Sequence, residues 1–405
     1  MLSTLDPLGL PLATEVLPGQ RADDQLSLPA ITRVREQLGQ RGLLYVGDGK
    51  MAALETRAFV HPGGDYYWCP LPERQLCPDQ LAGYLAPVWA GVQAVTPITR
   101  ERADGQLERI ADGYERLEQR QAIVAGHSVT WMERRLVVRS LQWAHREAAT
   151  VRKRVTKVQT KLETLTVRRR GKRRFRSVAA LRRVVAALLA RERVQGLLQV
   201  SYQDCRPGRP VRGYGERPAR VRQERTVEIR VAIDEAAMAA VERRLGWRVY
   251  ATNLSAAQLS LQQAVLAYRH QYLIERSFGR LKGRPLSLTP MYLQRDDHAT
   301  GLIRLLTIGL QVLTLLEFAA RRRLATTGTT LAGLYTGNPT RETAQPTGER
   351  LLAAFREITL TIWQDPHQTR RHVTPLSPLQ RHILALLALS TAIYTKLCTD
   401  SAKPP

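Results

Sequence analysis

The chain has 405 residues, 44% of them hydrophobic and 24% charged, so it is long enough to hold one elaborated domain or two, each with a core. Its formal net charge of +25 predicts a polyanionic partner, because every phosphate that a cation neutralises releases counterions and adds affinity. Small basic ribosomal or membrane-surface proteins are rarely so long or so rich in core residues, which leaves nucleic acid as the leading candidate.

Cysteines and apolar segments favour a cytosolic protein. The four cysteines show neither CxxC pairing nor zinc-site spacing, which is typical of reduced thiols. We expect no signal peptide, because the residues after Met1 lack a basic region. The apolar segments 301–318 and 382–397 are interrupted by polar and charged residues, so we expect buried helices and no membrane span.

The N-terminal region reads as a hairpin followed by alternating helices and strands. Ser27 can cap a helix that Pro29 opens. Asp48 follows a short apolar run in an Asp-Gly pair, which by itself is more typical of a turn than of a catalytic residue. The expected elements are a hairpin over 1–17, helices over 29–40 and 51–60, and strands over 43–46 and 65–69.

In the middle of the chain, a very basic segment interrupts the alternation of helices and strands. Between Arg152 and Arg176 there are twelve Lys or Arg residues against Glu163 alone. The segment is either a solvated, coiled-coil-like hairpin or a clamp that contacts phosphates on duplex flanks. Its candidate DNA-binding residues are Arg169, Arg170, Lys172, Arg173 and Arg174. The elements expected around it are strands over 123–141, 197–202 and 226–233 and helices over 144–165 and 178–191.

A further strand is expected over 245–253, and it carries Trp247. A Trp beside a strand is more often a core residue than a ligand-binding one. Beyond it, the sequence predicts a long apolar helix over 298–321, a linker over 327–347 and helices over 351–363 and 378–397.

The most informative stretch runs from Tyr268 to Lys282. At about 100° per residue, a helix would align four polar side chains in one stripe, namely Tyr268, Gln271, Glu275 and Lys282. An adjoining apolar stripe and a basic flank with Arg269, Arg276 and Arg280 would cover the rest. An ordinary amphipathic surface helix, with Glu275 paired to a neighbouring Arg, is the simpler interpretation.

This spacing resembles the C-terminal signature of the IS4-superfamily DDE transposases, with Gln271 where the family pattern usually has Arg. The continuation LKGRPLSLTPMYLQRDDHATGLIRLL resembles the IS1634-like branch. In the same comparison, YVGDGKM resembles the segment around the family's second catalytic Asp, which would be Asp48. The family's first Asp lies on a strand upstream of every segment matched here, so we expect the chain to be N-terminally truncated.

The resemblance implies roles for these residues. Asp48 and Glu275 would be catalytic and would hold Mg²⁺ or Mn²⁺ in a two-ion site, while Trp247 would stack on an extruded base. Binding to DNA would involve the polar and basic side chains of the signature, Tyr268, Gln271, Arg276 and Lys282. The partners implied are double-stranded transposon-end and target DNA and a second copy of the chain in a synaptic complex. The location implied is the cytoplasm, at the nucleoid.

The sequence therefore predicts a mixed α/β fold, a ribonuclease-H-like mixed sheet flanked by helices with a β-plus-helical-hairpin insertion and a helical C-terminal tail. The expected parts are the first part of the core (1–93), a basic insertion (94–245), the second part of the core with the Glu helix (246–325), and a linker with C-terminal helices (326–405). The predicted function is metal-dependent strand cleavage and transfer in the DNA recombination of a transposable element, an insertion sequence. The alternatives are a catalytically inactive DNA-binding remnant and a general nucleic-acid-binding protein.

Overall fold

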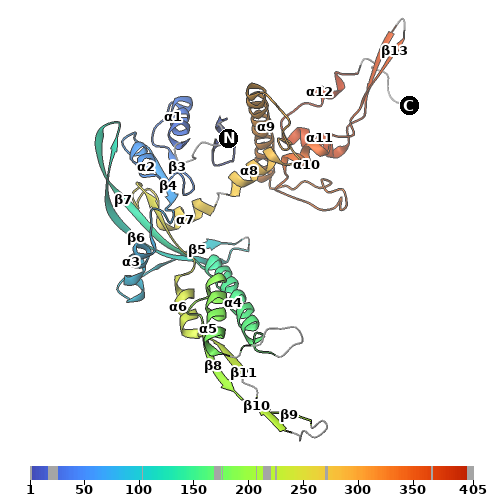
Figure 1. Ribbon diagram of the computed structural model, residues 1–405. Coiled ribbons are helices and arrows are strands. Elements are labelled where there is room, and N and C mark those ends of the chain that lie inside the picture. The colour runs from blue at the N-terminus through green and yellow to red at the C-terminus, as the bar shows by residue number, and fades with distance from the viewer. Residues whose placement is uncertain are drawn as a thin grey trace. The chain divides into compact units, whose positions relative to one another are not determined.

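Figure 1 shows the computed structural model of the chain. It describes residues 2–16, 26–102, 104–167, 175, 177–206, 208–212, 220–223, 226–269, 272–365 and 368–398. The chain separates into two units, one formed by residues 1–43 and 267–405 and the other by residues 44–266. This division is coarser than the four parts expected from the sequence.

A six-stranded mixed sheet organises the unit 44–266. Its strand order is β3-β4-β12-β7-β6-β5, with β3 and β4 parallel and every other neighbouring pair antiparallel. The mixed α/β class is therefore confirmed. The strands are β3 (Leu44–Val46), β4 (Tyr66–Pro70), β5 (Thr96–Glu101), β6 (Leu107–Val124), β7 (His127–Ser140) and β12 (Trp247–Thr252).

Helices α2 (Leu54–Val60) and α3 (Pro78–Trp89) pack against this sheet. Side chains alternate between the two faces of a strand. On β7, Val137 therefore shares a face with Glu133, and that face meets α3 through Tyr84 and Leu85. The sheet thus gains an apolar layer on the side where β7 also carries buried charges.

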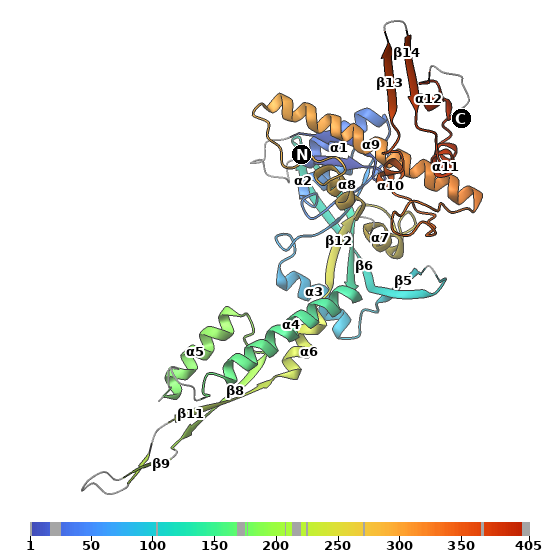
Figure 2. The same ribbon diagram turned by 90° about the vertical axis from the view of Figure 1, so that its right-hand side faces the viewer.

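The same unit contains a second core, which forms between β7 and β12. Helices α4 (Leu141–Glu163) and α5 (Val178–Arg191) pack with α6 (Glu235–Arg244) around the antiparallel pair β8 (Leu198–Cys205) and β11 (Thr226–Ile233) (Figure 2). A short hairpin of β9 (Gly208–Val211) and β10 (Arg220–Gln223) extends this part. These elements confirm the helices expected over 144–165 and 178–191 and the strands expected over 197–202 and 226–233. We call residues 141–246 the inserted module.

The inserted module leaves and rejoins the sheet at adjacent points. Ser140 ends β7 and caps α4, and its N–H donates to the Gly246 carbonyl oxygen at 2.9 Å, immediately before β12. Gly246 has a φ of +81°, and a Cβ there would lie 2.6 Å from that of Ala144. Only glycine fits this crossing without strain.

The other unit is mainly helical. Its N-terminal hairpin, β1 (Leu2–Leu5) and β2 (Pro11–Glu15), forms a two-stranded sheet of its own and confirms the predicted hairpin. Asp6 has a structural role, because its Oδ1 accepts the N–H groups of Leu8 and Leu10 at 2.9 and 2.8 Å. The helices of this unit are α1 (Ser27–Leu38), α8 (Tyr272–Lys282), α9 (Asp296–Thr327), α10 (Gly348–Ala353), α11 (Pro378–Leu386) and α12 (Ala392–Thr395), and α7 (Leu261–Arg269) spans the boundary between the units.

Helix α9 confirms the long apolar helix and anchors two clusters of its unit. One cluster joins Ile303 to Leu281 of α8, and the other joins Leu324 to Leu331 and Leu351. By length and composition α9 could cross a membrane, a test that core helices of soluble proteins also pass, and 28% of its most apolar window is buried. The opposite face of α9 is exposed, so the expected burial holds for one face only. The large apolar side chains on the exposed face include Leu305, Ile308, Val312 and Leu315.

Two local expectations held only in part, because the helix expected over 378–397 is divided into α11 and α12, and the strand expected over 123–141 is divided by a turn between β6 and β7. Three others were wrong. The helix predicted over 351–363 ends at Ala353, and a hairpin of β13 (Leu360–Asp365) and β14 (Gln368–Val373) follows, because Thr, Ile and Trp favour an extended backbone. The linker predicted over 327–347 is packed, since Leu331 and Leu334 are buried and Leu331 pairs with Thr343. Helix α1 has Leu26 and not Ser27 as its N-cap, with no side-chain hydrogen bond.

Candidate functional site

Asp48 lies in a tight turn directly after β3 and is exposed. Its Oδ1 accepts the N–H of Lys50 at 2.9 Å, and its carbonyl oxygen accepts the N–H of Met51 at 3.1 Å. The Gly47 N–H donates to the Trp68 carbonyl oxygen at 3.1 Å, which fixes this turn to β4. The turn-forming role of Asp48 is thus present, and its Oδ2 can still act as a ligand.

Glu275 occupies the first turn of α8 and is also exposed. Within the described part of the chain, no hydrogen bond or ion pair engages its carboxylate. Lys282 lies two turns along the same helix, is exposed, and has its Nζ 5.5 Å from the centre of the Phe278 ring. The helix buries its opposite side through Ser277 and Leu281. The Glu275 carboxylate and the Lys282 ammonium group therefore share one face of α8, and neither forms an ion pair with another described residue.

The basic flank of α8 is engaged by acids. Both oxygens of Glu317 on α9 lie 2.8 Å from Nη2 of Arg276, and Glu317 also pairs with Arg280. Arg280 is buried and contacts Glu349 as well, at 2.6 Å. Burial favours the neutral form of Glu317, but the arginines outweigh it and lower the pKa of this carboxyl. Arg276 as a phosphate contact stays a prediction, and the structure gives it a role in holding α8 on α9.

The remaining residues of the signature are distributed as follows. Tyr268 lies near the end of α7 and Glu275 in α8, while Gln271 falls outside the described residues, as do Arg169, Arg170, Lys172, Arg173 and Arg174. The single helix predicted over 268–282 is described as two helices, α7 up to Arg269 and α8 from Tyr272.

The two candidate metal ligands belong to different units, Asp48 to 44–266 and Glu275 to the other. Among the described residues there is no cluster of three or more His, Cys, Asp or Glu side chains that could hold a metal ion. Each carboxylate can supply the hard oxygen ligands that Mg²⁺ prefers, but neither makes a site alone. Their convergence stays a prediction.

Trp247 opens β12 and is half-buried. It packs beside the cluster of Tyr84, Val137 and Val249, and its Nε1–H donates to the Arg243 carbonyl oxygen at 3.1 Å. These contacts are those of a packing residue, which the sequence also favoured. Stacking on a DNA base stays a prediction.

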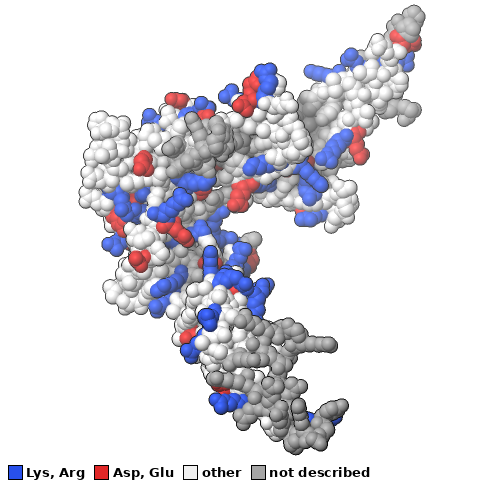
Figure 3. Space-filling model, in the orientation of Figure 1, with Lys and Arg blue, Asp and Glu red and all other residues white. Residues whose placement is uncertain are grey.

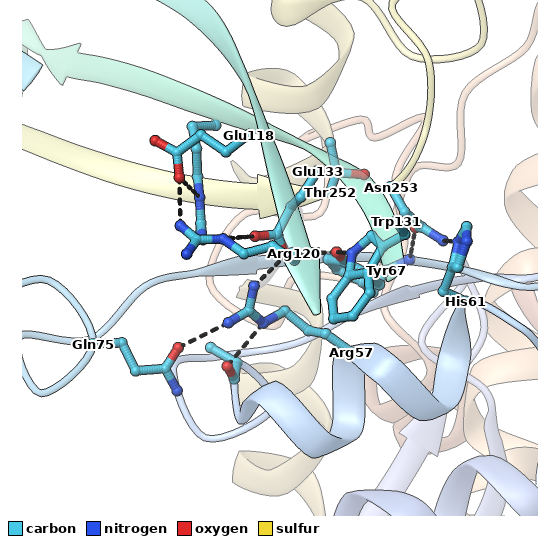
Figure 4. A network of polar contacts seen from close by, with 12 residues as sticks. Arg57, His61, Tyr67, Gln75, Glu118, Arg120, Trp131, Glu133, Thr252 and Asn253 are labelled. Carbon is cyan, nitrogen blue, oxygen red and sulfur yellow. Dashed lines mark hydrogen bonds and ion pairs between the residues drawn. The ribbon is translucent and has the colours of Figure 1, made fainter. Parts of the chain in front are cut away.

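A buried charge network in the sheet escaped the sequence analysis (Figure 4). Glu133 on β7 is completely buried, and its Oε2 accepts from Arg57 of α2 and from the Tyr67 hydroxyl, the latter at 2.5 Å. Its Oε1 lies 2.6 Å from Nη2 of Arg135 and 3.3 Å from Nε of Arg120. Glu133 is thus a counter-charge shared between a helix and three strands.

Further hydrogen bonds hold the members of this network in place. The Trp131 Nε1–H donates to the Tyr67 hydroxyl at 2.8 Å, and the Arg57 Nε–H donates to the Ala52 carbonyl oxygen at 3.0 Å. Burial and the negative charge of Glu133 both raise the pKa of Tyr67, so this hydroxyl remains a donor. Burial lowers the pKa of Arg57 less than Glu133 raises it, and the net shift is upward. Both groups keep the protonation state that Glu133 requires.

At one end of the network, Asn253 ties the end of β12 to β4. Its Oδ1 accepts the Tyr67 N–H at 2.9 Å and its Nδ2 donates to the Asp65 carbonyl oxygen at 3.0 Å. The same amide lies 3.3 Å from Nδ1 of His61, whose pKa burial lowers. The sequence signal for the whole network was Glu133 and Arg135 at a spacing of two within a strand, which puts two charges on one face.

Comparisons with known proteins add no assignment. No family model matches the chain, and no curated protein matches it.

Proposed function

We propose that the chain is a DDE-type transposase that binds transposon-end DNA and carries out metal-dependent strand cleavage and transfer. The observation that carries the proposal is the face of α8 on which an exposed, unpaired Glu275 precedes an exposed Lys282 by seven residues. By contrast, Glu317, the buried acid that holds α8 on α9, is paired with three arginines. The net charge of +25 supports a DNA partner.

Within this proposal the ribonuclease-H-like core is the finer fold assignment. It is supported by the order of β3, α2 and β4 with a parallel β3–β4 pair, and by the position of Asp48 directly after β3.

The chemistry proposed is an in-line substitution at phosphorus. Divalent ions held by Asp48 and Glu275 would supply charge stabilisation for the attacking and leaving oxygens. Asp48 would contribute Oδ2 while the Lys50 N–H holds Oδ1, and Glu275 would contribute its free carboxylate. Lys282 would contact a non-bridging phosphate oxygen as a point charge, and Tyr268 would donate its hydroxyl nearby.

A plasmid-nicking assay tests the proposal without knowledge of the transposon ends. Purified chain, supercoiled plasmid and Mn²⁺ should give open circles, and Glu275→Gln should abolish them while leaving plasmid binding intact. The matched control is Glu55→Gln, because Glu55 is likewise an exposed acid in the first turn of a helix, α2. Nicking that survives Glu275→Gln would refute the assignment.

The second candidate is a catalytically inactive DNA-binding remnant. It is favoured by the finding that the described residues bring no third carboxylate to either candidate ligand. Plasmid binding without nicking by the unmodified chain would support this function over the first.

A further inference from the structure

Helix α4 has two opposite faces of very different character. Its buried face packs into the core of the inserted module, with Val155, Val158 and Leu162 completely buried. Because this anchorage runs along the helix, its outer face is held rigidly at the surface. The outer face therefore presents its side chains in a fixed row.

All charged side chains on the outer face are basic. At about 100° per residue, Lys153 and Lys157 lie within about 20° of Arg146, and Arg154 within about 80°. Over residues 146–161, the half of the helix centred on Arg146 contains five cations and no carboxylate, the fifth cation being Lys161. Figure 3 shows Lys and Arg side chains gathered over this helix and its neighbours.

Four of these cations are not neutralised. Arg146, Lys153, Arg154 and Lys157 are exposed, and none has a carboxylate partner in the described part of the chain. Lys161, by contrast, lies 2.7 Å from a carboxylate oxygen of Glu192.

Three acids near the row have partners outside it. Glu235 and Glu242 pair with Arg152, on the flank of α4, and Glu147 accepts the N–H of Gly246. None of these three acids forms an ion pair with the four exposed cations of the row.

We propose that this face of α4 binds the phosphate backbone of duplex DNA. The spacing supports a repeating polyanion over a single anion: with a rise of about 1.5 Å per residue, the row from Arg146 to Lys157 spans about 16 Å. It supports a duplex over a single strand because residues 146–161 include no aromatic side chain on which unpaired bases could stack.

The hydroxyls in the row are turned away from a ligand. Thr150 and Thr160 donate to carbonyl oxygens of the helix itself, at 2.8 and 3.1 Å. The face thus offers charge and little directional hydrogen bonding, so it binds without reading base sequence.

The choice of DNA as the polyanion rests on the proposed function, but the binding requires no metal ion and neither Asp48 nor Glu275. A binding assay in EDTA therefore tests DNA binding separately from the proposed metal-dependent chemistry. Duplex binding by the unmodified chain without any nicking activity would refute the catalytic proposal and leave this one standing.

The experiment measures binding of the full chain to a fluorescent random duplex of about 30 base pairs, by anisotropy, from about 50 to about 200 mM salt. The test variant carries R146Q, K153Q, R154Q and K157Q, because Gln is a good helix former. Its matched control carries R100Q, R102Q, R109Q and R116Q, four partly exposed arginines that each lie within 4.0 Å of a carboxylate. Both variants lower the net charge from +25 by four, to +21.

The test variant should lose about 3–4 units of the slope of log K against log salt and bind at least about tenfold more weakly at 100 mM, since each phosphate contact contributes about 0.9 to that slope. The control should keep its slope within about one unit. Equal losses in both variants would show that net charge alone matters and would overturn the proposal.

Two further measurements complete the test, one of stability and one of membrane binding. Far-ultraviolet circular dichroism melts of both variants should match the unmodified chain, because the replaced side chains are exposed. Vesicles containing phosphatidylserine are the second probe, and a variant that loses vesicle binding while its duplex binding is unchanged would assign the face to a membrane surface and overturn the proposal.

Discussion

Each of the two units buries a carboxylate among arginines, Glu317 in one and Glu133 in the other. The two carboxylates differ in the elements that supply their partners. Glu317, on α9, meets three guanidinium groups and the Gly348 N–H, all from helices or their ends, and retains 5% exposure. Glu133, on β7, has no exposure and meets groups from a helix and three strands. Within the described chain, Arg135 Nη1 is buried without a hydrogen-bond partner.

The two sites show what surrounds a buried acid that stabilises the fold. At both positions arginines surround the carboxylate, because a buried charge without partners would cost several kcal/mol. Oε1 of Glu133 is within ion-pair distance of Arg135 and Arg120 but makes no hydrogen bond among the described residues. Asp48 and Glu275 are the opposite case, exposed and without an arginine partner among the described residues. Acids of this second kind can accept a ligand, and the comparison directs mutagenesis to each kind for a different purpose.

The largest effect is expected at Glu133. Glu133→Gln keeps the volume but removes the charge, so the buried Arg57 of α2 loses its counter-charge and Arg135 keeps only Glu118. We expect a loss of about 3–5 kcal/mol in the free energy of unfolding, measured by urea titration. Glu108→Gln is the control, because Glu108 forms only surface pairs with Arg100 and Arg102, and it should change little. A comparable loss in both variants would mean that the network contributes no more than a surface pair.

A smaller effect is expected at Glu317, and it depends on pH. Glu317→Gln should cost about 2–3 kcal/mol at neutral pH, because three guanidinium groups lose their shared acceptor. The pKa of Glu317 in the folded chain lies below its ordinary value of 4.5, so its stabilisation is complete above about pH 4.5 and is lost as the pH falls through the lowered pKa.

The difference in melting temperature between the unmodified chain and Glu317→Gln should therefore shrink from about pH 5 to about pH 3. Glu349→Gln gives the comparison within the same network, since Glu349 is more exposed and pairs with Arg280 alone. A difference that grew as the pH fell would contradict the lowered pKa.

The smallest effect concerns reactivity and not stability. Cys69 lies on β4 beside the Glu133 network, and burial raises the pKa of its thiol to about 12, while Cys77 is exposed. At about pH 8 a thiol reagent should modify Cys77 at least about 100-fold faster than Cys69 in the folded chain, as peptide mass spectrometry would show. In concentrated urea the two rates should converge. Similar rates in the folded chain would mean that this face of the sheet opens readily.

Local patterns predicted most of the helices. Apolar spacings of three and four residues identified α4, and the sequence also placed α5, α9, β8 and β11. The prediction failed over 351–363, where a hydrophobic run that could be helical proved to be a strand from Leu360 onward. Runs this short carry no period of their own, so pairing with β14 decided the outcome.

The candidate site was less predictable, because it depends on contacts between distant residues. The sequence placed Glu275 and Lys282 on one helix face, which α8 reproduces. It could not foresee that Arg280 would be buried against Glu317, 37 residues away. Nor could it foresee Glu133, because the partners of this residue, Arg57 and Tyr67, are 76 and 66 residues distant.

The way in which the inserted module joins the sheet determines how easily the module can be replaced or removed. The module departs after Ser140 and returns before Trp247, and these positions lie on neighbouring antiparallel strands, with Trp247 opposite Arg139. Two chain ends in this arrangement are the same distance apart as those of an ordinary β-hairpin, which a turn of two residues can connect. The more than one hundred intervening residues can therefore be exchanged, enlarged or removed as a cassette, while the pairing of β7 with β12 is preserved.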